Sequence, residues 1–92
     1  MKLEHVLTSL TADNEPARCA RSMLLWNMWD VHPTISCGDA STVSDGARLD
    51  GLGLGKLARR NGRRLFTRNE QGAEMADRLR AMGYKADGRI YT

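Results

Sequence analysis

Two stretches near the start of the chain carry apolar residues at helical spacing. The first holds four of them, three or four positions apart: Leu3, Val6, Leu7 and Leu10. It predicts a helix over residues 2–11, which a turn at residues 11–14 would end. A second helix is predicted from Asn14, a favourable N-cap residue, to about Asp30, because Pro33 disfavours helix in the residue before it.

The run 23–29 would make this second helix apolar nearly all the way round, and it contains both tryptophans. A helix of that kind lies in the core or packs against two partners at once. We expect a core helix. The alternative is that one face of it forms a homodimer through Trp26 and Trp29, since a chain of this length buries a limited core.

The middle of the chain predicts shorter elements. Residues 34–36 predict a short strand, and a helix capped by Asp39 or Ser41 is predicted to run to about Leu49, weakened by Gly46. Its inward positions would be Val43 and Ala47. Its outer face would carry mostly polar residues: Ser41, Thr42, Ser44, Asp45 and Arg48.

The glycine-rich stretch at 51–56 suggests a phosphate-binding loop but does not fit one. The P-loop motif is Gly-x4-Gly-Lys-Ser/Thr, whereas this chain has Asp50 and Leu57 at the deciding positions. We therefore interpret the stretch as a flexible or tightly turned connector.

Residues 55–67 are the most informative part of the chain. Asn61-Gly62 favours a type I′ turn, because both central residues of that turn need positive φ. A two-residue turn would place Arg60 opposite Arg63 and Arg59 opposite Arg64, so that both faces of the hairpin are cationic at the tip. Like charges placed opposite each other destabilise a sheet, and a phosphate between them would turn the repulsion into attraction. The alternative is an exposed hairpin whose charges protect its edges from aggregation.

A helix is predicted directly after the hairpin. Thr67 to Glu70 matches a capping box, and an apolar stripe follows at helical spacing: Ala73, Ala76, Leu79 and Met82. Gly83 and Tyr84 predict a Schellman end. The tail, residues 85–92, is mostly polar and would either extend or fray.

The net charge of +3 is distributed unevenly. Residues 1–55 hold four basic and seven acidic side chains, whereas residues 56–92 hold ten basic and four acidic ones. This asymmetry indicates an anionic partner for the second half, although a solvated basic face is the simpler alternative.

Other classes of function find little support in the sequence. We expect Cys19 and Cys37 to be free thiols, and no spacing of His and Cys favours a metal site. We expect no cofactor and no enzyme, because no nucleophile–base spacing or carboxylate pair stands out. We also expect no membrane partner and a cytoplasmic location, since no signal peptide or apolar span is evident.

From Ser41 onward the chain resembles the second half of winged-helix DNA-binding proteins, especially the MarR and PadR types. The matching residues are Ser41-Thr42-Val43-Ser44, Leu49, Leu52-Gly53, the stretch from Leu57 to Thr67, and Gly72. The resemblance implies that Ser41, Thr42, Ser44 and Arg48 face bases or phosphates. It implies wing contacts by Arg59, Arg60, Arg63 and Arg64. We also expect Lys56 and Arg68, which lie in and next to the hairpin, to contact the nucleic acid. The chain departs from the family because Pro33 to Gly55 leaves room for one good helix or two cramped ones.

We therefore expect a single domain over residues 1–92. Its fold class would be α+β and mostly helical, a winged-helix-like bundle with a two-stranded hairpin followed by a C-terminal helix. The expected function is that of a small transcriptional regulator, of bacterial or phage type, that binds double-stranded DNA. The alternative is a phage-type inhibitor or adaptor that binds an acidic surface of a host protein, for example a defence complex.

Overall fold

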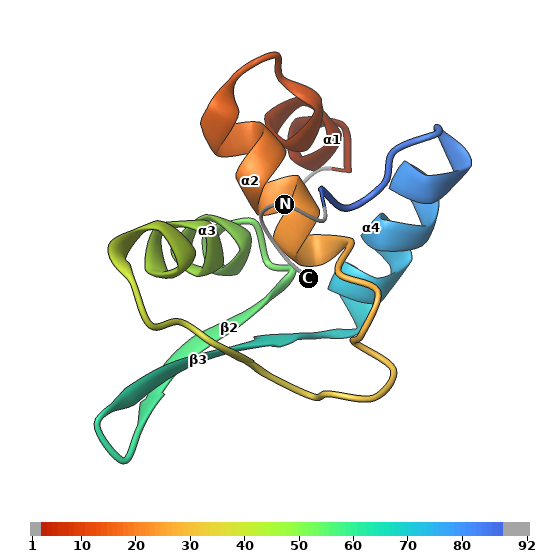
Figure 1. Ribbon diagram of the computed structural model, residues 1–92. Helices are drawn as coiled ribbons and strands as arrows, with labels where there is room; N and C mark the ends of the chain where they lie inside the picture. Colours follow the sequence, from red (N-terminus) through yellow and green to blue (C-terminus); the bar gives the residue numbers. More distant parts are fainter. Residues whose placement is uncertain (1–2, 88–92) are drawn as a thin grey trace.

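A computed structural model describes residues 3–87, which form an α+β fold with four helices and one antiparallel sheet. The helices are α1 (Leu3–Thr11), α2 (Glu15–Leu24), α3 (Ala40–Gly51) and α4 (Glu70–Ala81). The strands are β1 (Ile35–Ser36), β2 (Gly55–Arg60) and β3 (Arg63–Arg68), in the order β1-β3-β2. The β2–β3 hairpin projects from the helical body (Figure 1). The expected α+β fold with a β-hairpin followed by a C-terminal helix is confirmed, and it is compatible with a winged-helix-like architecture. A single helix lies between β1 and the hairpin.

Helix α2 ends at Leu24, well before the predicted end at Asp30, so the prediction was wrong for the segment that holds both tryptophans. The carbonyl of Met23 accepts the Trp29 indole N–H at 3.0 Å and the backbone N–H of Trp26 at 3.3 Å. The turned chain brings the Trp29 ring edge-on to Phe66 in β3, with 5.9 Å between centroids. Tertiary packing of Trp29 thus overrides the local helical pattern.

The part of the predicted helix that holds Trp26 and Trp29, and through which the alternative placed a homodimer, is therefore not helical. The two indoles instead contact each other edge-on at 5.6 Å, and Trp26 stacks on His32 at 5.8 Å. Both rings are half-buried within the chain. The homodimer remains untested, but it no longer has this helix as its basis.

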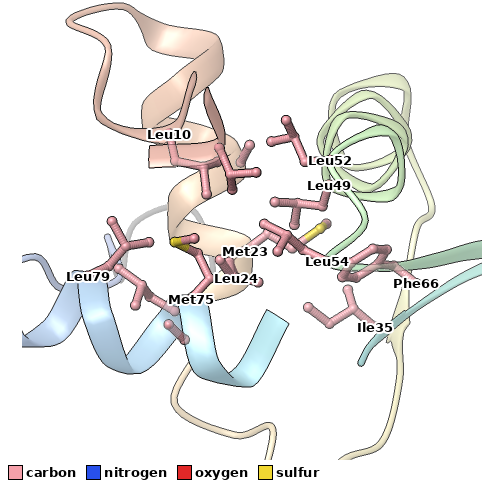
Figure 2. Packing of buried hydrophobic residues seen from close by; sticks show 14 of the residues in the cluster. Leu10, Met23, Leu24, Ile35, Leu49, Leu52, Leu54, Phe66, Met75 and Leu79 are labelled. Atoms are coloured by element: carbon pink, nitrogen blue, oxygen red, sulfur yellow. The ribbon is translucent and has the colours of Figure 1, made fainter. Parts of the chain in front are cut away.

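The core is formed by side chains from all four helices and from the sheet. Figure 2 shows Met23 and Leu24 of α2 between Leu79 of α4 on one side and Leu49 of α3 on the other. Phe66 is fully buried and joins the base of the hairpin to this core. The apolar end of the hairpin is thereby held in place, while the other end remains in solvent.

Helix α3 begins at the N-cap Asp39, one of the two caps predicted, whose carboxylate accepts the Thr42 N–H at 2.7 Å. Gly46 faces the sheet, where an added Cβ would lie 3.3 Å from Leu57 and 3.5 Å from Phe66. The helix-weakening glycine therefore allows close contact between helix and sheet.

The predicted faces of α3 need two corrections. Asp45, expected on the outer face, is buried with 5% of its surface exposed, and Ala47, expected inside, is exposed. The reason is that α3 packs against both α2 and β2, which turns position 45 inward and position 47 to solvent.

The hairpin register is the predicted one. Arg60 pairs with Arg63, Arg59 with Arg64 and Leu57 with Phe66. The turn residues Asn61 and Gly62 have φ of 52° and 77°, as a type I′ turn requires. The left-handed backbone at Gly62 explains why glycine stands there.

Helix α4 begins later than predicted. Its N-cap is Asn69, whose side chain accepts the Gly72 N–H at 2.8 Å, whereas Thr67 stays in β3 opposite Lys56. The hairpin is longer than the capping-box prediction allowed, because the strand pairing continues to Arg68.

The end of α4 is the predicted Schellman motif. The N–H groups of Gly83 and Tyr84 donate to the carbonyls of Arg80 and Leu79 at 2.9 and 3.0 Å. After it, the Asp87 N–H donates to the Ser22 hydroxyl, so residues 84–87 return to α2. Position 2 of the first predicted helix and residues 88–92 of the predicted tail lie outside the described residues. Within residues 3–87, no helix has the length and apolar character needed to cross a bilayer.

Candidate nucleic-acid interface

The free end of the β2–β3 hairpin carries four arginines in two cross-strand pairs. Arg59 lies opposite Arg64, and Arg60 lies opposite Arg63 next to the turn. All four side chains are exposed. The hairpin thus concentrates four guanidinium groups within two residue pairs, at the part of the fold that extends farthest from the core (Figure 1).

These guanidinium groups have no acidic partner among the described residues. Within residues 3–87, the ion pairs closer than 4.0 Å are Arg18–Glu15 and Arg80–Asp77, and neither involves the hairpin. Like charges directly opposite each other destabilise a sheet, and no ion pair within residues 3–87 offsets that effect at the hairpin end. The hairpin end therefore presents uncompensated positive charge to solvent.

Strand alternation places the two arginine pairs on opposite faces of the hairpin. Arg59 and Arg64 share their face with Leu57 and Phe66, and this is the face against which α3 packs. Arg60 and Arg63 share the other face with Ala58 and Leu65. Lys56 and Thr67 also belong to that second face, and both are exposed.

A cleft of about 460 Å³ lies between the hairpin and the beginning of α3. Arg59 and Arg64 line it from the sheet, together with Arg63 from the turn. The opposite wall is the connection from β1 to α3: Ser36, Cys37, Gly38 and Asp39. Neither Arg60 nor Lys56 lines this cleft, so the four-arginine cluster has an inner and an outer part.

Helix α3 places three of its four predicted contact residues on its exposed surface. Ser41, Ser44 and Arg48 are exposed and border a second cleft of about 390 Å³. The other wall of that cleft belongs to α2 and includes Glu15. A carboxylate on the facing wall makes this surface less favourable for phosphate than the hairpin.

Thr42 has a structural role in α3. Its hydroxyl donates to the Asp39 carboxylate at 2.8 Å, and its backbone N–H donates to the same group at 2.7 Å. These bonds hold the pKa of Asp39 below its usual value, because they stabilise the ionised carboxylate. Thr42 therefore completes the cap of the helix and is the least available of the predicted contacts.

Arg68, predicted beside the wing contacts, lies apart from them at the base of the hairpin. Its guanidinium donates to the carbonyl of Leu24 at 3.2 Å and lies 5.4 Å from the centre of the Trp29 ring. Burial lowers the pKa of Arg68, with Arg80 adding to the effect, yet arginine remains charged in proteins. Arg68 therefore holds the hairpin in place, and we leave it out of the interface.

Sequence reasoning missed the residues that form the far wall of the cleft. Ser36, Cys37 and Gly38 come next to the hairpin because β1 pairs with β3, and the Cys37 N–H donates to the Arg64 carbonyl at 2.9 Å. The short strand was predicted, but its pairing partner was not. A strand of two residues carries too little pattern to fix its pairing.

The thiols and histidines offer little chemistry in this structure. Cys19 and Cys37 are free, and burial raises the pKa of both thiols, so the unreactive protonated form is favoured. Among residues 3–87, no three side chains of the types that ligate metals lie together.

Comparisons of the chain with protein-family models, curated proteins and solved structures gave no match.

Proposed function

We propose that this protein binds double-stranded DNA through the arginine-rich end of its β2–β3 hairpin, as a small transcriptional regulator of bacterial or phage type. In this proposal it is a binding protein and not an enzyme, and it acts in the cytoplasm, where its DNA is. Arg59, Arg60, Arg63 and Arg64 contact phosphates, Lys56 adds to the attraction, and Ser41, Ser44 and Arg48 provide secondary contacts from α3.

One observation supports this proposal above the others. Four exposed guanidinium groups face each other across the hairpin, and no carboxylate among the described residues pairs with them. Guanidinium and phosphate match in charge and in bidentate geometry, so a phosphate backbone would turn an unfavourable arrangement into a favourable one. A hairpin with a purely structural role gains no stability from it.

The test measures the affinity for a short random-sequence duplex by fluorescence anisotropy at several salt concentrations. Each phosphate contact contributes about −0.9 to the slope of log K against log salt. Four contacts predict a slope near −3.6, which corresponds to about a hundredfold loss of affinity between 50 and 200 mM salt. Replacement of Arg59, Arg60, Arg63 and Arg64 by glutamine should abolish binding and flatten the salt dependence.

A charge-matched variant provides the control. Replacing Arg18, Arg78, Arg80 and Lys85 by glutamine removes the same number of charges from exposed positions outside the hairpin. This control should retain most of the affinity. Equal losses in the two variants would mean that net charge, not the hairpin, governs the attraction.

The second candidate is an inhibitor or adaptor that binds an acidic surface of a host protein with the same arginines. The acidic excess of residues 1–55 favours it, because a duplex lying along the helical body would meet repulsion there. A protein partner would need to contact the hairpin alone. Absence of duplex binding at low salt, with retained hairpin-dependent binding to a purified acidic protein, would select this candidate.

A further inference from the structure

We infer that the cleft between the hairpin and α3 binds one backbone phosphate of the DNA, held by Arg59 and Arg64, whereas Arg60 and Lys56 meet phosphates only on the open face of the hairpin. This inference rests on the proposed function and divides the hairpin arginines by role. The proposal so far treats all four as equivalent, and the structure gives them different surroundings.

The side chains of Arg59 and Arg64 are placed to act together. Arg59 and Arg64 lie directly opposite each other on the face of the hairpin that looks toward α3. Both line the cleft, and within residues 3–87 neither has an ion pair or a side-chain hydrogen bond. Two guanidinium groups on the same wall can donate to different oxygens of one phosphate.

The cleft has room for one phosphate group. Its volume of about 460 Å³ falls in the range of about 300–1,000 Å³ in which proteins bind small ligands, so a phosphate with part of its sugar fits. Ser36, at the end of β1, is also part of the lining. Arg60 and Lys56 are exposed on the other face of the hairpin and do not line this cleft.

The two walls of the cleft differ in polarity. Asp39 lies on the α3 side of the cleft, where its carboxylate is already bound by Thr42. Its negative charge repels an anion from that wall, so a phosphate would lie against the hairpin arginines. The uncharged deoxyribose would then lie toward Asp39.

The test compares two double variants that each remove two charges from the hairpin. Arg59→Gln with Arg64→Gln removes the two opposed guanidinium groups from the cleft and leaves Arg63 in its lining. Lys56→Gln with Arg60→Gln removes the same charge from the outer face. We expect the cleft variant to lose about tenfold or more in affinity for random duplex, because charge-assisted hydrogen bonds disappear. It should also lose about one unit of salt slope. The outer-face variant should lose less than about threefold at the same salt concentration.

A second measurement locates the contact directly. In amide NMR spectra recorded during titration with the duplex, the signals of Ser36, Cys37 and Gly38 should shift together with that of Arg64. In the cleft variant these shifts should disappear, while its spectrum without DNA should show the same fold as that of the wild type.

The outcomes separate this inference from the proposed function. If wild-type protein binds duplex and the two double variants lose affinity equally, the cleft has no special role and the inference is overturned, while the proposed function stands. If wild-type protein binds no duplex even at low salt, both fail. A larger loss of affinity in the cleft variant than in the outer-face variant, together with the NMR shifts at the cleft, supports both.

Discussion

The guanidinium group of Arg68 in β3 donates a hydrogen bond to the main-chain carbonyl of Leu24 at the end of α2, over 3.2 Å. Carbonyls at the end of a helix have no partner within the helix. Trp29 supplies a donor to the neighbouring carbonyl of Met23, and Arg68 lies over the ring of the same tryptophan. The base of the hairpin is thereby joined to the helical body by Arg68, which lies at the opposite end of β3 from the cationic tip.

Arg68→Gln should destabilise the protein by about 1–2 kcal/mol, since it removes a charge-assisted hydrogen bond and a cation–π contact from a half-buried site. Arg60→Gln removes the same charge from the exposed tip and should change stability by no more than about 0.5 kcal/mol. Urea denaturation of the two variants measures the difference. Equal midpoints would show that the bond from Arg68 to Leu24 contributes nothing.

Gly72→Ala should be strongly destabilising, by about 1–3 kcal/mol, because a Cβ at this position would collide with the backbone carbonyl of Leu54 and the side chain of Arg68. In a helix without such a collision, alanine is more favourable than glycine by about 1 kcal/mol. Gly51→Ala is the matched control, since it lies in α3 with no atom within 4 Å of the added methyl group. Thermal unfolding should therefore shift in opposite directions for the two variants, and a gain for Gly72→Ala would contradict the close packing of α4 on Leu54.

The hairpin could be predicted from the sequence because its determinants are local. Asn61 and Gly62 fix the turn type, the turn fixes the register, and the register assigns each arginine to a face. The Schellman end at Gly83 followed from one glycine and its neighbour in the same way. Elements determined by a few adjacent residues were therefore accessible without the structure.

The course of the chain around Trp29 depends on distant contacts and was not accessible. Its local pattern is helical, but Phe66 and Arg68 approach the ring from β3 and favour a turn instead. The cleft has the same origin, since its second wall depends on β1 pairing with β3 across the chain. The orientation of Asp45 likewise followed from packing of α3 on two neighbours, which the helix periodicity alone did not define.

Stability should fall in acid partly through Asp39. Its carboxylate accepts hydrogen bonds from Thr42, so its pKa in the folded protein lies below the ordinary value of 3.8. The contribution is fully present above that value and is lost as the pH falls through the lower folded pKa. Asp39→Asn keeps a capping oxygen that does not titrate. Between about pH 5 and pH 2, the range in which carboxylates titrate, this variant should therefore lose less stability than the wild type. Parallel loss in both proteins on urea denaturation would assign the acid sensitivity to other carboxylates.

Asp50→Ala should separate stability from DNA affinity. The Asp50 carboxylate accepts the N–H of Leu57 at 2.9 Å, and Leu57 belongs to β2, the strand at the edge of the sheet. Loss of this bond should cost about 1 kcal/mol on denaturation and leave an edge N–H free, which promotes self-association detectable by sedimentation. The same change removes a negative charge near the base of the hairpin, so affinity for duplex should stay constant or rise under conditions in which the variant is folded.

Asp13→Ala is the control for charge alone. Asp13 is exposed, lies far from the hairpin in sequence and makes no hydrogen bond to the sheet. If affinity falls with stability in the folded Asp50 variant, the arginines depend on the edge bond for their placement, and the hairpin does not bind as a rigid, independent ribbon.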